Sequence, residues 1–326
     1  MNSYANARYA TQLRLPQVGQ VGQARLARAR VLVIGAGGLG SAVLPLLAGA
    51  GVGTLRIVDP DYVEEGNLHR QTLYRMADIG QPKAMVAADA LHALNPYIRI
   101  DAEVAALDPV NAPSWVAESD VVIDAADLFA VTYALSDVCL TMSKVLVSAS
   151  VQGSQGYAGV FCGGAPSYRA LFPQWPRSAA DCATVGVLGP TVALLGCLQA
   201  ELVLAILLGV ERDPRGSLWR WDAQRFGFSQ FDFWGAEEPV AYCPVLGLSQ
   251  VAPEDVLIDL RSLQEAPNPL TKDALRCELC ALESVLPRLP RDRRIVLACR
   301  SGLRASQAAE RLKSVGYRDL ALLALG

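Results

Sequence analysis

This sequence has few histidines and no excess of positive charge. Two histidines occur among 326 residues, and 29 basic residues stand against 32 acidic ones, for a net charge of −3. A nucleic-acid surface needs a clear basic excess, so we expect no nucleic-acid partner. The N-terminal residues contain no charged and apolar leader with a cleavage site. We therefore expect the 8 cysteines to be reduced thiols in the cytoplasm rather than disulfides.

One apolar run, residues 185–210, is long enough to span a bilayer. Gln199 and Glu201 fall inside it, and Gly189 and Pro190 interrupt it. No basic cluster flanks it. These features favour a buried core helix over the alternative of a membrane span, so we expect no membrane partner.

The apolar pattern predicts an α/β fold, with a Rossmann-like doubly wound sheet followed by a small C-terminal α/β part. Strands are predicted at 31–34, 54–59, 120–127 and 144–151, a helix at 80–96 and a hairpin at 218–233. After a linker near 235–250, strands are predicted at 255–260, 294–299 and 319–325, with a helix at 305–316. We predict one domain over residues 1–240, and a linker and second domain over residues 241–326.

A glycine-rich turn follows the first predicted strand and begins a helix. Its glycines are Gly35, Gly37, Gly38 and Gly40. Such a turn lets a phosphate approach backbone N–H groups at the helix N-terminus. Asp59 ends the next strand, about where an acid contacts a ribose hydroxyl. Taken alone, this motif favours an NAD-binding domain over an ATP site.

Polar residues after the second strand shift the balance towards a triphosphate. Asn67, Arg70 and Lys83 follow Asp59, and fixed positive charge stabilises the charge that builds on leaving pyrophosphate. Hydride transfer to a nicotinamide needs no such set. Asp127 lies at the end of the third strand, where an acid can hold Mg²⁺ against the phosphates. The alternative is that Arg70 and Lys83 are ordinary solvated helix charges.

Four stretches, in order, resemble one enzyme family. They are RVLVIGAGGLGS, GVGTLRIVDPDYVEEGNLHRQTLY, IGQPKA and LGPTVALLGCLQA, within about residues 8–235. They are similar to the molybdopterin-synthase and thiamine-pathway adenylyltransferases, bacterial relatives of ubiquitin-activating enzymes. The resemblance implies a homodimer that uses ATP to convert the C-terminal Gly-Gly carboxylate of a small β-grasp sulfur-carrier protein to an acyl-adenylate. It assigns the ribose to Asp59, the phosphates to Asn67, Arg70 and Lys83, and Mg²⁺ to Asp127.

Two positions near the implied nucleotide site depart from the family pattern. An N-terminal arginine that reaches the phosphates of the neighbouring subunit is replaced by Thr11. Of the two nearby arginines, we expect Arg14 rather than Arg8 to take over that contact, if a helical turn brings it to the same face. The alternative is that the charge is simply lost and adenylation is slow. Leu128 follows Asp127 where relatives have asparagine.

The cysteines of the family's zinc site are also altered. Relatives use two Cys-x-x-Cys pairs, and the matching residues here are Ser167, Ala170, Cys243 and Leu246. One thiolate cannot form a tetrahedral site, so we expect no zinc and a region held by packing. Cys182 stands where relatives have a loop cysteine that joins to the carrier; the alternative is a small buried residue.

A second cysteine motif lies near the C-terminus. It consists of Cys299, Arg300, Ser301, Gly302, Leu303 and Arg304, between a predicted strand and a helix. Backbone N–H groups and the positive helix end there stabilise a thiolate and a persulfide, and the arginines attract anionic donors. The alternative is a buried cysteine at a strand end.

With LIDLR at 257–261, this motif resembles single-domain rhodaneses over about residues 250–326. The resemblance implies that Cys299 carries sulfane sulfur, taken from thiosulfate or a cysteine desulfurase. The segment between LIDLR and the Cys299 motif differs from that of rhodaneses, and the rhodanese-like domain is short, so we expect this domain to pack on the first one.

The segment between the two motifs contains Cys277 and Cys280. These are packing residues, a resolving thiol pair or part of a metal site.

The two ends together predict an adenylyltransferase with sulfurtransferase activity. The Cys299 persulfide would attack the acyl-adenylate, and a second thiol, with Cys182 the best candidate, would release a thiocarboxylate. Two alternatives stay open, a carrier-docking sulfurtransferase that does not adenylate and an NAD-dependent oxidoreductase. The sequence does not identify the carrier or its pathway.

Overall fold

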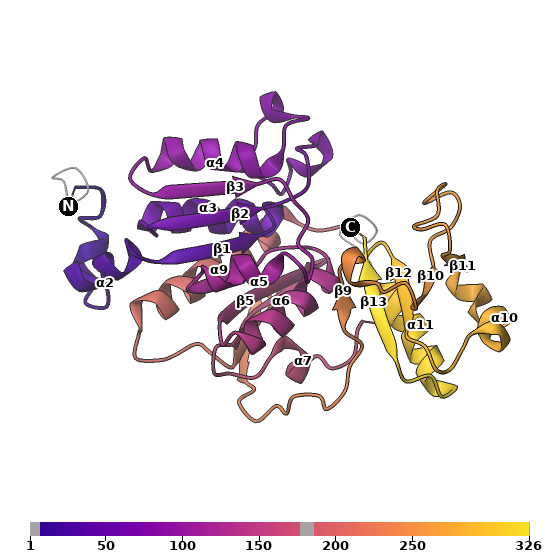
Figure 1. Cartoon of the computed structure of the whole chain (residues 1–326). Coiled ribbons are helices and arrows are strands. Elements are labelled where there is room, and N and C mark those ends of the chain that lie inside the picture. Colours follow the sequence, from indigo (N-terminus) through magenta and orange to yellow (C-terminus); the bar gives the residue numbers. More distant parts are fainter. Residues whose placement is uncertain (1–6, 177–185, 326) are drawn as a thin grey trace.

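The computed structural model describes residues 7–176 and 186–325, which form two sheets. An eight-stranded sheet has the order β3-β2-β1-β4-β5-β6-β7-β8, and a five-stranded sheet has the order β11-β10-β12-β13-β9. The first contains β1 Arg30–Ile34, β2 Thr54–Val58, β3 Arg99–Glu103, β4 Val121–Asp124, β5 Val145–Gln152, β6 Gln155–Cys162, β7 Ser217–Asp222 and β8 Gly227–Asp232. The second contains β9 Val245–Leu246, β10 Val256–Asp259, β11 Leu275–Arg276, β12 Ile295–Cys299 and β13 Leu320–Ala324. We call residues 245–325 the C-terminal part; it lies at one side of the larger sheet, opposite the N-terminus (Figure 1).

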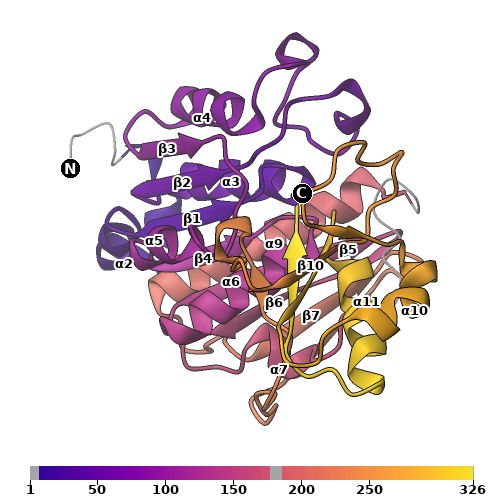
Figure 2. The same ribbon diagram turned by 45° about the vertical axis from the view of Figure 1, so that its right-hand side comes forward.

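Helices flank both sheets, and Figure 2 shows them from a second side. The α-helices are α2 Gly19–Leu26, α3 Gly38–Ala50, α4 Lys83–Leu94, α5 Ala112–Ala117, α6 Phe129–Thr141, α7 Tyr168–Leu171, α9 Gly189–Leu208, α10 Leu282–Val285 and α11 Leu303–Ser314. Short 3₁₀ turns are η1 Gln12–Arg14, η2 Glu65–Asn67, η3 Met76–Asp78, η4 Leu248–Gln250, η5 Leu279–Ala281 and η6 Leu286–Arg288.

The central strand β1 shows why the larger sheet is covered on both faces. Its side chains alternate between faces, as a strand period of two requires. Leu32 and Ile34 join one core with helices α5 and α6, whereas Val31 and Val33 join another with α3, α4 and α9. A parallel strand buried on both faces needs such a continuous apolar run.

Strand order predicts a ligand crevice beside the glycine-rich turn. β1 to β5 are parallel, and β1 pairs with β2 on one side and β4 on the other. The chain runs from β1 to β2 and β3 on one side of β1 and then crosses over to β4 on the other side, so the strand order reverses at β1. Open α/β sheets bind ligands at the carboxyl ends of the strands at this point.

Every predicted strand and helix of the sequence analysis is present, with ends moved by a few residues. The hairpin of β7 and β8 bends before Gly227, as predicted. Strand β6 was not predicted, although it pairs with both β5 and β7 in antiparallel register. The boundary at residue 240 stays a prediction.

The long apolar run forms α9. Among the described residues, α9 is the one helix that is long and apolar enough, by length and composition, to cross a membrane. Half of its most apolar window is buried inside the protein. It packs on α3, β5 and β6, and the buried Gln199 Nε2 donates a 2.8 Å hydrogen bond to the Asp124 carbonyl. These contacts are those of a core helix, which the sequence analysis favoured over a membrane span.

One continuous cluster of buried side chains joins the two sheets. It includes Leu32 and Tyr133 from the larger sheet and its helices, and Leu297 and Leu303 from the C-terminal part. The expectation that the C-terminal part packs on the rest of the chain is therefore confirmed.

Candidate active sites

The glycine-rich turn has one open side. A Cβ on Gly35 would lie 2.6 Å from the Ala125 carbonyl oxygen, and one on Gly40 would lie 2.3 Å from that of Gly35. These glycines let the turn pack closely on β4 and on itself. By contrast, a Cβ on Gly37 would meet only the Gln71 Nε2 atom, at 3.6 Å. Gly37 therefore faces the space into which a ligand can come.

Unused polar groups surround this open side. Gly37 is the N-cap of α3 and has no side chain to bind the first N–H groups of the helix. The buried Ser41 Oγ, in the first turn, and the buried Gln71 Oε1 have no hydrogen-bond partner. Buried polar atoms are nearly always paired, so these groups fit a polar ligand such as a nucleotide phosphate.

Asp59 shapes the turn from the neighbouring strand. Its Oδ2 accepts a 2.6 Å hydrogen bond from the Ala36 N–H, and its Oδ1 accepts a 2.8 Å bond from the Asp61 N–H. The carboxylate is 4% exposed, and burial raises its pKa above the ordinary value despite these bonds. A ribose hydroxyl at Asp59 would share oxygens that already hold the turn, and this role stays a prediction.

Lys83 is held by an acid that the sequence analysis did not consider. Its Nζ lies 2.9 Å from the Asp61 Oδ2, and the Lys83 side chain is 6% exposed whereas that of Asp61 is 65% exposed. The signal for Asp61 was its spacing, two residues after Asp59 on a chain that turns back to α4. The ion pair holds the Lys83 ammonium group in place next to Asp61.

Asn67 and Arg70 form one cationic group. The Arg70 Nη2 donates a 2.9 Å hydrogen bond to the Asn67 Oδ1, and the Arg70 Nη1 lies 2.9 Å from the His69 Nε2. The first turn of α9 packs on this segment, since a Cβ on Gly189 would lie 2.5 Å from the His69 carbonyl oxygen. The structure thus brings Arg70 to the N-terminal ends of both α3 and α9.

Asp127 is exposed just beyond β4, which ends at Asp124 rather than at the predicted residue 127; its role with Mg²⁺ stays a prediction. Leu128 is the N-cap of α6 and makes no side-chain capping bond. The nearby Asp124 is fully buried and accepts hydrogen bonds from the Thr132 Oγ1 at 2.7 Å and the Ser148 Oγ at 2.8 Å. Asp127 is therefore the free carboxylate at this strand end, and Asp124 fastens α6 and β5 to β4.

The N-terminal segment lies at the far end of α3. The Gln12 Nε2 donates a 3.0 Å hydrogen bond to the carbonyl of Ala50, the last residue of α3. Residues Gln12–Arg14 form a 3₁₀ turn, and the Arg14 N–H bonds the Thr11 carbonyl, so both side chains leave one helical turn. The helical alternative for Arg14 is confirmed.

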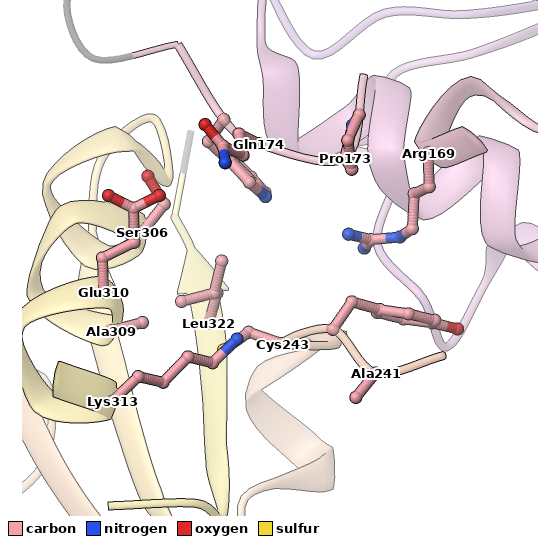
Figure 3. Close-up of a pocket in the computed structure, with 12 residues that line it drawn as sticks. Arg169, Pro173, Gln174, Ala241, Cys243, Ser306, Ala309, Glu310, Lys313 and Leu322 are labelled. Atoms are coloured by element: carbon pink, nitrogen blue, oxygen red, sulfur yellow. The ribbon is translucent and has the colours of Figure 1, made fainter. Parts of the chain in front are cut away.

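A pocket lies between the C-terminal part and the larger sheet (Figure 3). Arg169, Gln174 and Trp175 line one side, and Ser306, Glu310 and Lys313 of α11 line the other. Among the described residues, those of the glycine-rich turn are not part of its lining. This pocket is a seam between the two parts and is separate from the nucleotide crevice.

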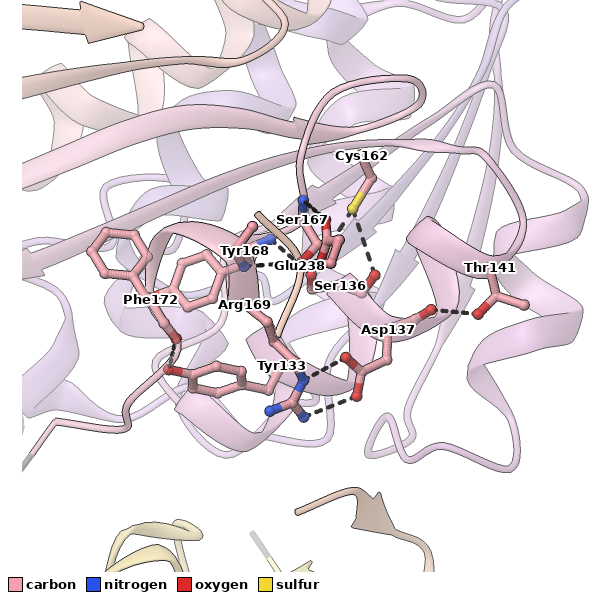
Figure 4. A network of polar contacts seen from close by, with 11 residues as sticks. Tyr133, Ser136, Asp137, Thr141, Cys162, Ser167, Tyr168, Arg169, Phe172 and Glu238 are labelled. Atoms are coloured by element: carbon pink, nitrogen blue, oxygen red, sulfur yellow. Dashed lines mark hydrogen bonds and ion pairs between the residues drawn. The ribbon is translucent and has the colours of Figure 1, made fainter. Parts of the chain in front are cut away.

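A polar network occupies the region of the altered zinc ligands (Figure 4). The Ser167 N–H and Oγ both donate to the Glu238 carboxylate, at 2.7 and 2.6 Å. The Arg169 guanidinium donates two bonds to Asp137 and lies over the rings of Tyr133 and Tyr242, with centroids at 4.7 and 4.0 Å. The sequence analysis expected packing alone, and the network adds hydrogen bonds, an ion pair and cation–π contacts.

Cys299 ends β12 and begins the turn to α11. Its Sγ accepts a 3.1 Å hydrogen bond from the Gly302 N–H, which is the type of contact predicted for a persulfide loop. Gly302 has a φ of +86° that favours glycine. Arg300 is exposed, whereas the Arg304 Nη2 is 2.6 Å from the Glu265 Oε1 and is half-buried. Arg300 is thus the freer of the two arginines for an anionic donor.

Other cysteines fall into distinct settings. Cys277 is buried after β11, and burial raises the pKa of its thiol, whereas Cys280 is exposed in η5. The two therefore do not share the helix that the packing alternative assumed. Among the described residues no group of three or more histidines, cysteines and acids is positioned to hold a metal. Cys182 lies outside the described residues.

Comparisons with known proteins identify relatives of this chain. Residues 9–245 match the ThiF family. The sulfur carrier protein adenylyltransferase of Thermus thermophilus is 41% identical, over 74% of this chain and 90% of that protein. The probable adenylyltransferase/sulfurtransferase MoeZ of Mycobacterium tuberculosis is 32% identical, over 96% of this chain and 89% of that protein. The second match extends through the C-terminal part.

Solved structures share the fold over about three quarters of this chain. The crystal structure of E. coli MccB with ATP has a TM-score of 0.62 and 20% identity, over 73% of this chain and 74% of that one. The crystal structure of PaaA has a TM-score of 0.61, over 72% of this chain and 75% of that one.

Proposed function

Because this chain belongs to the ThiF family, we propose that it activates the C-terminal Gly-Gly carboxylate of a small β-grasp sulfur-carrier protein and converts it to a thiocarboxylate. The observation that carries the proposal is that one chain contains both an open glycine-rich turn with unpartnered polar groups and a cysteine loop at the end of β12. We assign adenylation to residues 1–240 and sulfur transfer to residues 241–326.

In the first step the carrier carboxylate attacks the α-phosphorus of ATP, and pyrophosphate leaves. The turn at Gly37 and the N-terminus of α3 bind phosphate oxygens, while Arg70 and Lys83 neutralise the charge that builds on pyrophosphate. The enzyme gains most of its rate by orienting two reactants and stabilising charge. Lys83 reaches the phosphates when it leaves Asp61, whose exposed carboxylate remains in water.

Asp127 would hold Mg²⁺ together with the phosphate oxygens. An exposed carboxylate at this strand end suits a cation that keeps several waters and binds through one or two carboxylates. The metal would supply positive charge to the triphosphate. Asp124 is excluded from this role because it is fully buried and both of its oxygens have partners. Its Oδ2 accepts hydrogen bonds from the Thr132 and Ser148 hydroxyls, and its Oδ1 accepts one from the Ala126 N–H.

In the second stage sulfur moves through Cys299. Its thiolate takes the outer sulfur of a donor such as thiosulfate and releases sulfite, or receives sulfur from a cysteine desulfurase. The persulfide then attacks the acyl-adenylate, AMP leaves, and an acyl-disulfide joins the carrier to Cys299. A second thiolate, for which Cys182 is the candidate, attacks the Cys299 sulfur and releases the thiocarboxylate. A dithiol reductant must then reduce the Cys299–Cys182 disulfide.

A homodimer completes the phosphate site in this proposal, and we place it in the cytoplasm. Arg14 lies near the C-terminal end of α3, and the 13 residues of that helix separate it from the glycine-rich turn by about 20 Å. An arginine side chain cannot cover that distance within its own chain. Arg14 can serve as a phosphate ligand only if a second copy of the chain presents it.

ATP–pyrophosphate exchange tests the adenylation step. We expect exchange only when a carrier ending in Gly-Gly is present. Exchange that is absent with every such carrier, together with intact thiosulfate sulfurtransfer, would instead favour a carrier-docking sulfurtransferase. The altered Thr11 and Leu128 are the observations behind that second candidate.

A further inference from the structure

The cysteine loop contacts a tryptophan of the segment that follows α7. A Cβ on Gly302 would lie 2.8 Å from the Trp175 Cζ3 and 3.2 Å from the Ala130 Cβ. Gly302 is the residue whose N–H bonds the Cys299 sulfur. The indole and the first turn of α6 therefore contact the backbone that forms the sulfur cradle, and glycine is needed for that approach.

Trp175 is itself held in a fixed orientation. Its ring stacks on Tyr133 with a centroid distance of 4.5 Å and an interplanar angle of 16°. The Tyr133 hydroxyl donates a 2.8 Å hydrogen bond to the Phe172 carbonyl, and Tyr133 comes from the middle of α6. The indole is 9% exposed. A stacked and bonded ring pair of this kind makes a rigid platform rather than a loose cover.

The platform also fixes where the cysteine lies. Ala130 belongs to the first turn of α6, three residues after Asp127, so the cradle touches the segment that leads out of the nucleotide crevice. A persulfide extends about 2 Å beyond the Cys299 Sγ, which adds to its reach. At the same time Cys299 has 0% exposure, so a donor from solvent cannot touch its sulfur while the loop is seated.

We propose that Trp175 is a positioning residue that seats the Cys299 loop beside the nucleotide crevice of the same chain. The proposal rests on the proposed function and adds an order of events. Donors load Cys299 when the C-terminal part lifts from Trp175, and reseating returns the loaded cysteine to its own adenylate. Removing the indole therefore separates sulfur loading from sulfur delivery.

Trp175→Ala tests the proposal in the full-length chain, with Trp175→Phe as the conservative variant. Four quantities are measured: ATP–pyrophosphate exchange, thiosulfate–cyanide sulfurtransfer, carrier thiocarboxylate formation, and the rate at which iodoacetamide modifies Cys299. In Trp175→Ala we expect ATP–pyrophosphate exchange to be unchanged and thiosulfate–cyanide sulfurtransfer to be unchanged or faster. Alkylation of Cys299 should be faster. Thiocarboxylate formation should fall about 10- to 100-fold. Trp175→Phe should restore most of the thiocarboxylate because a flat ring remains on Tyr133.

Two controls separate positioning from loss of structure. Cys139 is equally buried in α6, and its alkylation should stay slow in Trp175→Ala if the fold is intact. Trp221→Ala removes a half-buried indole from β7, away from the cysteine loop, and should leave Cys299 protected.

Three results would overturn the seating role. They are unchanged thiocarboxylate formation in Trp175→Ala, wild-type Cys299 alkylation as fast as in that variant, or a parallel fall of all activities with exposure of Cys139. If instead the wild-type chain forms no adenylate, the proposed function fails, and the alkylation rates alone still decide whether Trp175 seats the loop.

Discussion

Arg169 is bound to Asp137 by two hydrogen bonds, from Nε to Oδ1 at 2.6 Å and from Nη2 to Oδ2 at 2.9 Å. The Arg169 side chain is 4% exposed, and Tyr133 and Tyr242 cover its guanidinium. Tyr242 precedes Cys243 in the segment that leads into β9 of the C-terminal part. The Arg169–Asp137 pair therefore holds the segment around Tyr242 and Cys243, where the family resemblance implies a zinc site.

Arg169→Ala should lower the free energy of unfolding by about 3 kcal/mol, because it leaves Asp137 partly buried without its partner. Burial already raises the pKa of Asp137 above its ordinary value, which the two Arg169 bonds oppose. Urea unfolding measures the change. Asp137→Asn combined with Arg169→Ala should cost less than the sum of the single variants, since the stranded charge is gone.

Metal analysis tests whether the polar network around Arg169 stands in place of a zinc site. We expect less than stoichiometric zinc in the purified chain and no effect of a chelator on its melting temperature. One zinc per chain would contradict the polar network as a replacement. Cys243, Cys277, Cys280 and Cys162 would then be the first ligands to test.

Lys83→Ala and Asp127→Ala should each abolish carrier-dependent ATP consumption and leave thiosulfate sulfurtransfer intact. Lys83 supplies charge to the phosphates and Asp127 the carboxylate for Mg²⁺, while Cys299 lies in the other part. Cys299→Ala is the matched control, with the opposite pattern of loss. Equal loss of both activities in a folded Lys83 variant would refute the division of labour.

Arg14→Ala should slow pyrophosphate exchange by about 100-fold if a second copy presents Arg14 to the phosphates, as loss of one transition-state charge predicts. Arg8→Ala serves as the control, since Arg8 is also exposed near the N-terminus. Unchanged exchange in Arg14→Ala, together with faster exchange in Thr11→Arg, would show that the charge was lost. A monodisperse monomer at micromolar concentration would also oppose this role.

Asp124 makes stability depend on pH. Burial raises its pKa from 3.8 to about 6, so the folded chain holds this proton more tightly than the unfolded chain does. Its contribution to the free energy of unfolding should therefore fall as the pH rises through 4 to 6, by on the order of 3 kcal/mol. Asp124→Asn should remove that part of the slope, which urea unfolding at pH 4.5 and 7 measures. A difference between variant and wild type that is independent of pH would contradict this.

The sequence predicted the parts of the fold that local patterns specify. Apolar runs and the turn at Gly35 placed the strands and the crevice, and Asn67 and Arg70 were predicted as members of one site and do lie together. Lys83 was predicted as well, but its partner Asp61 was missed because the pairing depends on how the chain returns to α4.

Contacts between distant segments could not be predicted from one sequence. Nothing local links Trp175 to Gly302, which are 127 positions apart, or Ser167 to Glu238. Loss of the zinc ligands was visible in the sequence, but the network that fills their place depends on Asp137 of α6 and on Tyr242. Such contacts follow from packing of the two sheets rather than from periodicity.

The most direct measurement is the mass of a Gly-Gly carrier after incubation with this chain, ATP, Mg²⁺, thiosulfate and a dithiol reductant. We predict replacement of one C-terminal oxygen by sulfur in the intact carrier, dependent on ATP and lost in both Lys83→Ala and Cys299→Ala. A carrier whose mass stays unchanged with the wild-type chain, or a thiocarboxylate that still forms in Cys299→Ala, would contradict the joining of adenylation and sulfur transfer in one enzyme.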